Sequence, residues 1–153
     1  MERKAFLKVC GFVCLGGSAL MTVLEGCGTS GYFAQFVLAN NQIILKKSEF
    51  QKVEKSKSKT EPDRIIQRKY VLVNADQLRF PIGVYQIEAD KYTALWLQCT
   101  HKGCEVKPND NYLACPCHGS EFTNEGAVQQ GPAEEPLKTF QTKTDNENIY
   151  IQL

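Results

Sequence analysis

Hydrophobic residues beyond Arg64 recur in short β-branched or aromatic runs, with turn-forming residues between them. The runs lie at 70–73, 82–87, 93–97 and 148–152. Turn residues occupy 74–76, 88–90 and 145–146. No part of this region repeats its apolar positions at the 3.6-residue period of a helix over a useful length. The pattern therefore predicts an all-β fold, a small antiparallel barrel or sandwich, without an internal repeat.

The pattern changes upstream of this region. Residues 42–45 form one more short apolar run, which is a strand candidate. Residues 46–63 are polar and rich in Lys and Ser, with no hydrophobic period, and this composition predicts a solvated loop or a hinge. We interpret 42–153 as the folded domain and 28–41 as a tether that leads into it.

The N-terminus has the order of an export signal. Arg3, Lys4 and Lys8 precede an apolar run at 9–24, as in secretory signals. Segment 3–8 resembles a twin-arginine signal with Lys4 in the second position, and an ordinary signal is the alternative. The run is shorter than the roughly 20 apolar residues of a comfortable membrane span. It ends at Cys27, in a sequence similar to a lipoprotein cleavage box. Residues 1–27 are therefore expected to be an export signal or membrane anchor, with lipidated Cys27, an uncleaved span and secretion as alternatives.

Composition limits the remaining possibilities. The chain has 153 residues, 42% hydrophobic and 23% charged, which suits one modest globular domain with accessory segments. A net charge of +1 gives no reason to expect nucleic acid as a partner. The charge is segregated, with nine basic and four acidic residues at 46–69 (9 − 4 = +5) and six and eleven at 70–153 (6 − 11 = −5). The acidic part could attract a basic electron-transfer partner, or the two parts are simply solvated faces.

Two motifs carry the candidate chemistry. They read Cys99-Thr100-His101-Lys102-Gly103-Cys104 and Cys115-Pro116-Cys117-His118-Gly119-Ser120, and they hold both histidines and four of the seven cysteines. Each motif offers one Cys and one His at close spacing. A structural zinc site is the alternative, but such sites usually pair like ligands. A Rieske [2Fe–2S] centre uses this mixed set, because two His replace two Cys on one of its irons.

Cys104 and Cys117 are the second cysteine of each motif. A disulfide between them would join the two loops and would indicate an oxidising compartment, which agrees with an export signal. Two free thiols, or alternative iron ligands, are the other interpretations.

The motifs resemble those of Rieske iron–sulfur proteins, in the disulfide-containing branch found in cytochrome bc-type complexes. The resemblance continues through Phe122, Gly126 and Val128 to 131–133 and 136–137, and covers roughly 42–153. It implies an antiparallel β sandwich with a small cluster-binding subdomain, and one [2Fe–2S] cluster. By this resemblance Cys99 and Cys115 bind the inner iron, and His101 and His118 bind the outer iron. Gly131-Pro132 would form a proline loop on a third side of the cluster, or would be an ordinary turn.

Three positions bear on the potential and the substrate. By the resemblance, the Ser120 hydroxyl donates to a bridging sulfide and raises the potential. Phe122 stands where high-potential members have a tyrosine, so we expect an intermediate potential. Lys102 stands where quinol-oxidising members usually have leucine, which weakens the inference to quinol.

The resulting functional hypothesis is electron transfer at the outer face of the bacterial cytoplasmic membrane, in a bc-like quinol-oxidising respiratory complex. The expected partners are the membrane, a cytochrome or other redox subunit, and quinol. The alternative is a small Rieske subunit of an exported oxidoreductase such as arsenite oxidase. Rieske oxygenases and their ferredoxins lack cysteines matching Cys104 and Cys117. Any enzymatic activity would belong to the complex rather than to this chain.

Overall fold

The computed structural model describes residues 31–56, 60 and 62–153. The predicted export signal or anchor, including Cys27, lies outside the described residues. In chain order the elements are β1 (Phe36–Ala39), β2 (Gln42–Lys46), the 3-10 helix η1 (Lys47–Phe50), β3 (Gln51–Glu54), β4 (Arg64–Gln67), β5 (Tyr70–Val73), β6 (Ile82–Glu88), β7 (Lys91–Trp96), β8 (Lys107–Pro108), β9 (Tyr112–Ala114), β10 (Glu121–Thr123), β11 (Val128–Gln130), β12 (Thr139–Phe140), β13 (Thr142–Thr144) and β14 (Asn148–Gln152). In the part of the chain that is described, no helix is long and apolar enough to cross a membrane.

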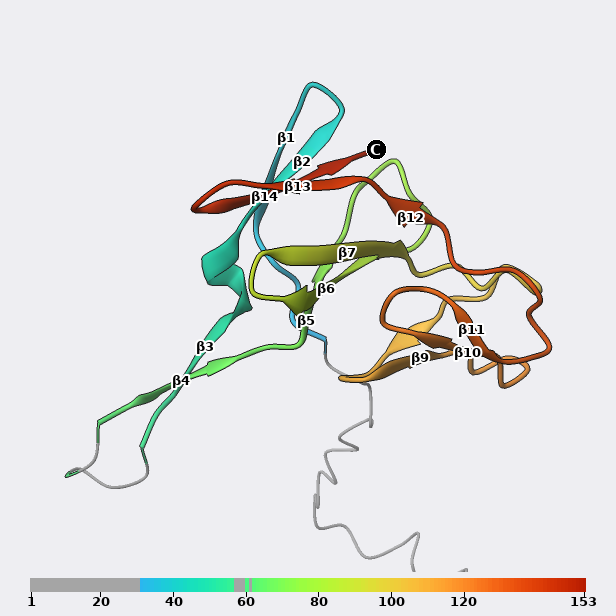
Figure 1. Ribbon diagram of the computed structural model, residues 1–153, viewed down its shortest axis with the longest axis horizontal. Coiled ribbons are helices and arrows are strands. Elements are labelled where there is room, and N and C mark those ends of the chain that lie inside the picture. Colours follow the sequence, from blue (N-terminus) through green and yellow to red (C-terminus); the bar gives the residue numbers. More distant parts are fainter. Residues whose placement is uncertain (1–30, 57–59, 61) are drawn as a thin grey trace, which may run out of the picture.

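Two four-stranded antiparallel sheets form the main body (Figure 1). One has the strand order β1-β2-β14-β13 and the other β12-β7-β6-β5. Side chains alternate across a strand, and β2 and β14 accordingly bury Ile43, Leu45, Ile149 and Ile151 on one face. These residues share one hydrophobic cluster with residues of β5, β6 and β7, such as Val84. The predicted sandwich is confirmed.

A third sheet, of order β11-β10-β9-β8, forms a smaller subdomain beside the sandwich (Figure 1). Its strands are two or three residues long, too short to create a readable alternation. A second core joins the two units, in which Leu95 and Leu97 meet Leu113 and Phe122. The subdomain is thereby held on the end of β6 and β7.

The five predicted apolar runs form strands. The segment that was expected to be a tether differs from its prediction. The runs at 42–45, 70–73, 82–87, 93–97 and 148–152 correspond to β2, β5, β6, β7 and β14. The expected tether at 28–41 instead joins the sandwich from Phe33 onward. Phe33 bridges to Leu72, Ala34 is buried, and β1 pairs with β2 along its length.

The segment expected to be a solvated loop, 46–63, is also more ordered than predicted. It begins with η1, whose Phe50 is fully buried and packs edge-on against Tyr92 at 5.3 Å between ring centroids. It continues as β3, which pairs with β4 in a separate two-stranded ribbon. Every residue of that ribbon is exposed, so no hydrophobic alternation marks it in the sequence.

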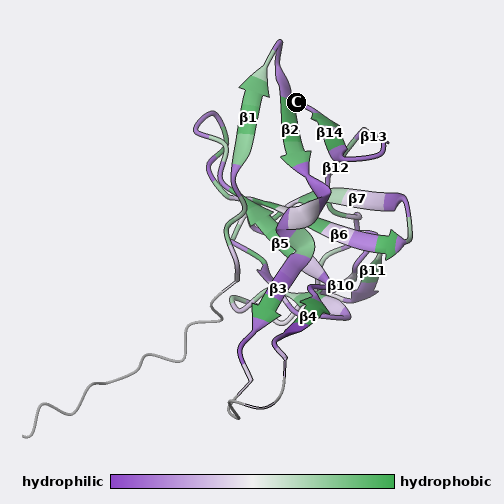
Figure 2. Ribbon diagram, turned by 90° about the vertical axis from the view of Figure 1, so that its left-hand side faces the viewer, coloured by the Kyte–Doolittle hydropathy of each residue, from purple (hydrophilic) through white to green (hydrophobic). Residues whose placement is uncertain are grey.

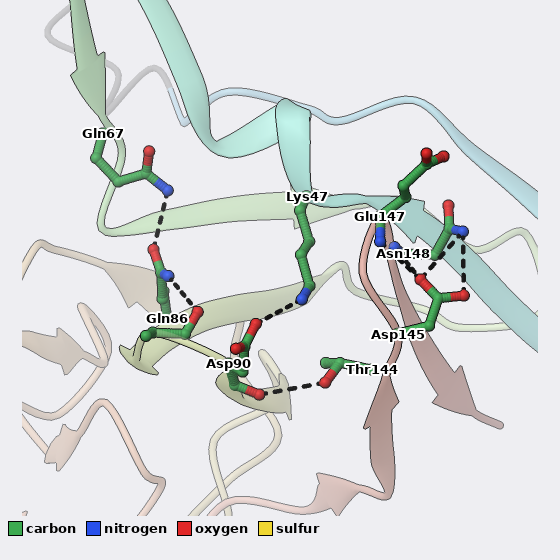
Figure 3. A network of polar contacts seen from close by, with 9 residues as sticks. Lys47, Gln67, Gln86, Asp90, Thr144, Asp145, Glu147 and Asn148 are labelled. Atoms are coloured by element: carbon green, nitrogen blue, oxygen red, sulfur yellow. Dashed lines mark hydrogen bonds and ion pairs between the residues drawn. The ribbon is translucent and has the colours of Figure 1, made fainter.

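Polar contacts link η1 to two turns of the sandwich (Figure 3). Lys47 Nζ lies 2.6 Å from a carboxylate oxygen of Asp90 in the β6–β7 turn. In the β13–β14 turn, Asp145 accepts hydrogen bonds from two backbone amides and from the Tyr150 hydroxyl. The Tyr150 hydroxyl and these amides hold the pKa of the Asp145 carboxyl well below its usual range. The network fixes the edge of the body from which the ribbon extends.

Candidate metal centre

The two motif loops follow β7 and β9 and share one hydrogen-bonding pattern. Cys99 N donates to Cys104 O at 2.8 Å, and Cys115 N donates to Ser120 O at the same distance. Each loop also has a glycine four positions after its first cysteine, whose N–H donates back to that cysteine's carbonyl oxygen, at 2.8 Å and 3.0 Å. The same turn is therefore built twice.

Both turns require glycine. Gly103 has a φ of 70° and Gly119 a φ of 78°, in the left-handed region that glycine enters without a steric penalty. The equal spacing of Cys99 to Gly103 and of Cys115 to Gly119 was visible in the sequence. This spacing is a signal for the shared turn that the prediction of no internal repeat did not include.

The first cysteine of each loop points into the interior. Cys99 and Cys115 are free thiols, each 2% exposed, and both belong to the second core. Burial and a hydrogen bond with the Cys99 side chain raise the pKa of the Cys115 thiol, and the backbone N–H groups of Cys117 and His118 act in the opposite direction. Amide donors directed at a sulfur stabilise its thiolate, which is the form that binds metal.

The two histidines lie beside each other nearer the surface. Their ring centroids are 4.9 Å apart and their planes are nearly perpendicular, at 88°. His101 is half-buried and His118 is exposed. Among the described residues, none offers a hydrogen-bond partner to the buried Nδ1 of His101. A buried polar atom left unpaired is costly, and a metal bound at that nitrogen would remove the cost.

The predicted disulfide is present. Cys104 and Cys117 are bonded, with their Cα atoms 6.6 Å apart. The sulfurs of Cys104, Cys115 and Cys117 lie within 4.8 Å of one another. Because two of these sulfurs bond to each other, their closeness places the bridge against Cys115 and does not indicate a three-cysteine metal site. The structure brings the two imidazoles together and, separately, the side chains of Cys99 and Cys115. This two-thiol, two-imidazole donor set fits the chemistry of a Rieske cluster.

A third segment contacts both loops. Ala133 N donates to the Ser120 hydroxyl oxygen at 3.0 Å, and Thr100 Oγ1 donates to Glu135 O at 2.7 Å. This segment begins at the cis peptide bond between Gly131 and Pro132. A cavity of about 510 Å³ lies between it and the first loop, lined by Thr100, His101, Pro132, Glu134 and Glu135. The contact through Thr100 had no signal in the sequence.

The remaining predicted positions differ in exposure. Ser120 is fully buried, and because its oxygen accepts the bond from Ala133, its own hydrogen is free to be donated. Phe122 is fully buried in the same core as Cys99 and Cys115. Lys102 is exposed.

Comparison with known proteins decides the family. The family model of the Rieske [2Fe-2S] domain matches residues 41–141. The chain belongs to the Rieske [2Fe–2S] family. One Rieske-type cluster is therefore its cofactor.

Curated relatives of this Rieske protein include two cytochrome b6-f complex iron-sulfur subunits. Subunit 2 from Nostoc sp. is 34% identical over 84 residues, covering 54% of this chain and 41% of the relative. The subunit from Chlorobaculum tepidum is 33% identical over 81 residues, covering 46% of this chain and 45% of the relative. The matched region thus spans less than half the length of either relative.

Solved structures give similar matches. The plasma membrane Rieske protein PetC3 from Synechocystis has a TM-score of 0.49 and 31% identity, covering 56% of this chain and 87% of that one. A chain of a hyperthermophilic respiratory complex III has a TM-score of 0.45 and 21% identity, covering 95% of both chains.

The disulfide predicts a measurable contribution to the stability of the Rieske domain. The double variant Cys104→Ala/Cys117→Ala should unfold more easily, because a bridge across a separation of 13 residues contributes about 3 kcal/mol in the chain-entropy model. Denaturant unfolding gives this difference, and visible absorbance during heating should show earlier cluster loss. Lys102→Ala, in the same loop, is the control and should match the parent. Equal unfolding of parent and double variant would contradict the prediction.

Proposed function

We propose that this chain transfers electrons through its Rieske cluster, with Cys99, Cys115, His101 and His118 as the cluster ligands. The carrying observation is the unpaired, buried Nδ1 of His101 beside His118, in two loops that each also carry a buried free thiol. When bound, such a cluster supplies a site that accepts and releases one electron, at a higher potential than all-cysteine clusters.

The chain's own residues give the site a closed side and an open side. The buried thiols of Cys99 and Cys115 are shielded from water by the second core, and backbone amides support the charge on Cys115. His118 is exposed, so a partner can approach the cluster through its ring. These features support electron transfer at the exposed histidine edge.

The ligand assignment predicts a spectroscopic loss. His118→Ala should abolish the rhombic electron-spin resonance signal of the reduced protein, because a Rieske centre needs two histidines on one iron. Lys102→Gln is the control, since this exposed neighbour of His101 is not a ligand, and its signal should be retained. A retained Rieske signal in His118→Ala would refute the assignment.

Phe122 predicts the direction of a shift in potential. By the family resemblance, a hydroxyl in this place donates to a ligand sulfur, and such a bond is stronger in the reduced, more negative state. Phe122→Tyr should raise the midpoint by about 60 mV, if the bond favours the reduced state by about 1.4 kcal/mol. A redox titration measures the shift, with Tyr112→Phe on β9 as the control. No change, or a fall, would contradict this explanation.

We further propose that the chain acts in a bc-like complex at the outer face of the membrane, held by residues 1–27. The names of its relatives as cytochrome b6-f subunits support this assignment. Gly119 also favours the bc-like branch by resemblance, and its φ of 78° explains the need for glycine there. Lys102, exposed beside His101, argues against a tight apolar quinol contact at that edge.

Purification from native membranes tests the partner. We expect a cytochrome b to co-purify with the chain and to be identified by mass spectrometry. The control is a parallel purification from membranes of cells that lack the chain, which should yield no cytochrome b. A molybdenum enzyme in place of the cytochrome would instead indicate the exported-oxidoreductase alternative.

A further inference from the structure

The β3–β4 ribbon extends from the body at the end opposite the cluster-binding subdomain (Figure 1). All eight residues of its two strands are exposed. Its register places Val53 opposite Ile65, so both side chains lie on one face. They are 60% and 68% exposed. A two-stranded ribbon alone is marginal in water, and one that also exposes an apolar pair is suited to being covered.

The base of the ribbon is held firmly. Arg68 N donates to Phe50 O at 2.7 Å, and the Arg68 side chain donates to the carbonyl oxygens of Glu49 and Gln51. The Arg68 guanidinium also lies 3.9 Å from the centre of the Tyr32 ring. The ribbon therefore has a defined direction relative to the body and to the point where the described chain begins.

That starting point sets how far the ribbon can be from a membrane. A cavity of about 410 Å³ at the base is lined by Gly31 and Tyr32 together with Lys52, Lys69 and other residues. From Cys27 to Gly31 the chain can reach at most roughly 14 Å, and from Leu24 roughly 25 Å. The strand and its extension at 51–56 are about 20 Å long at ~3.3 Å per residue. An anchor of either predicted kind keeps the bilayer within reach of the ribbon.

Charge distinguishes the two exposed apolar regions, the β3–β4 ribbon and the β1–β2 hairpin, as candidate sites for membrane contact. The ribbon with its connecting residues, 51–67, carries five basic and three acidic residues (5 − 3 = +2), and the other basic residues of 46–69 flank its base. The β1–β2 hairpin also exposes apolar residues, among them Val37 at 62%, but positions 32–45 contain no charged residue. Apolar side chains among Lys and Arg are the combination that binds anionic bilayer surfaces. Figure 2 shows the hydrophobic and hydrophilic residues mixed along the ribbon.

We infer that the β3–β4 ribbon docks on an anionic phospholipid surface. Val53 and Ile65 enter the boundary between headgroups and acyl chains, and the lysines of the ribbon meet the lipid phosphates. Lys52 lies on the opposite face, and its long side chain can turn its charge toward the headgroups. The inference rests on the anchor in the proposed function, and it adds a second attachment that orients the domain.

The test places a fluorescent reporter on the ribbon of the full chain. Ile65→Trp is compared with Val37→Trp, a similarly exposed apolar position on the β1–β2 hairpin. Each is reconstituted into vesicles of brominated phosphatidylcholine, alone or mixed equally with phosphatidylglycerol. Trp96, the other tryptophan of the chain, is half-buried, and its signal in the parent is subtracted.

Ile65→Trp should be quenched about twofold more strongly in the anionic vesicles, and high salt should remove the difference. Val37→Trp should show no such dependence. Adding Lys52→Gln and Lys55→Gln to Ile65→Trp should weaken the anionic effect while leaving the anchor in place.

Several outcomes would overturn the inference. One is a chain that sediments with vesicles while Ile65→Trp stays unquenched, and another is equal quenching of Val37→Trp. In detergent, the Ile65→Trp fluorescence could instead become more protected from quenching as the protein concentration rises. That result would indicate that a second copy of the chain covers the ribbon. A chain that fails to sediment would refute both the anchor and the ribbon contact. The spin-resonance signal, measured on the same samples, reports separately on the cluster.

Discussion

The Cys104–Cys117 disulfide joins the two motif loops, which follow β7 and β9. The site depends on these two loops lying side by side. Each loop carries one interior thiol and one outward imidazole, so neither can complete a four-ligand set alone. The turns are shaped locally, by glycines at positive φ and by paired backbone hydrogen bonds. The bridge then holds the two turns in register, with its sulfurs against Cys115. The bridge adds a covalent link between loops whose neighbouring strands, β8 to β11, are only two or three residues long.

Burial makes the two sides of the site chemically different. The second core buries Cys99 and Cys115, which disfavours thiolate charge, and the backbone amides of Cys117 and His118 offset part of that cost at Cys115. Imidazoles tolerate water and can exchange protons, so they occupy the surface. The Nδ1 atom of His101 is buried and has no hydrogen-bond partner among the described residues, so a bound metal would satisfy it. This asymmetry supports the proposal that electrons are exchanged at the histidine edge.

The strands with dense β-branched runs could be predicted from the sequence, because burying them dominates their local energetics. The Cys104–Cys117 disulfide could also be predicted, since the two motifs that contain it have few other uses, while the four cluster ligands stay a prediction. The ribbon could not, because neither of its strands buries a side chain. Contacts such as Thr100 with Glu135 depend on the path of a distant backbone segment, which no local pattern reveals. Phe50 illustrates the same limit, as one buried aromatic in a polar stretch that shows no period.

The separation of charge along the chain gains a meaning from the fold. Part of the basic segment forms the exposed β3–β4 ribbon at one end of the long axis, and the cluster loops, in the acidic 70–153 part of the sequence, lie near the other end (Figure 1). A bilayer held by the ribbon would therefore not cover the histidine edge. We propose a protein partner for that edge, and Glu134 and Glu135, which line the cavity beside His101, would favour a basic one. Lys102 adds to this argument, because an exposed cation beside His101 disfavours insertion of the edge into an apolar quinol pocket. Electron exchange through a facing redox protein satisfies all three constraints at once.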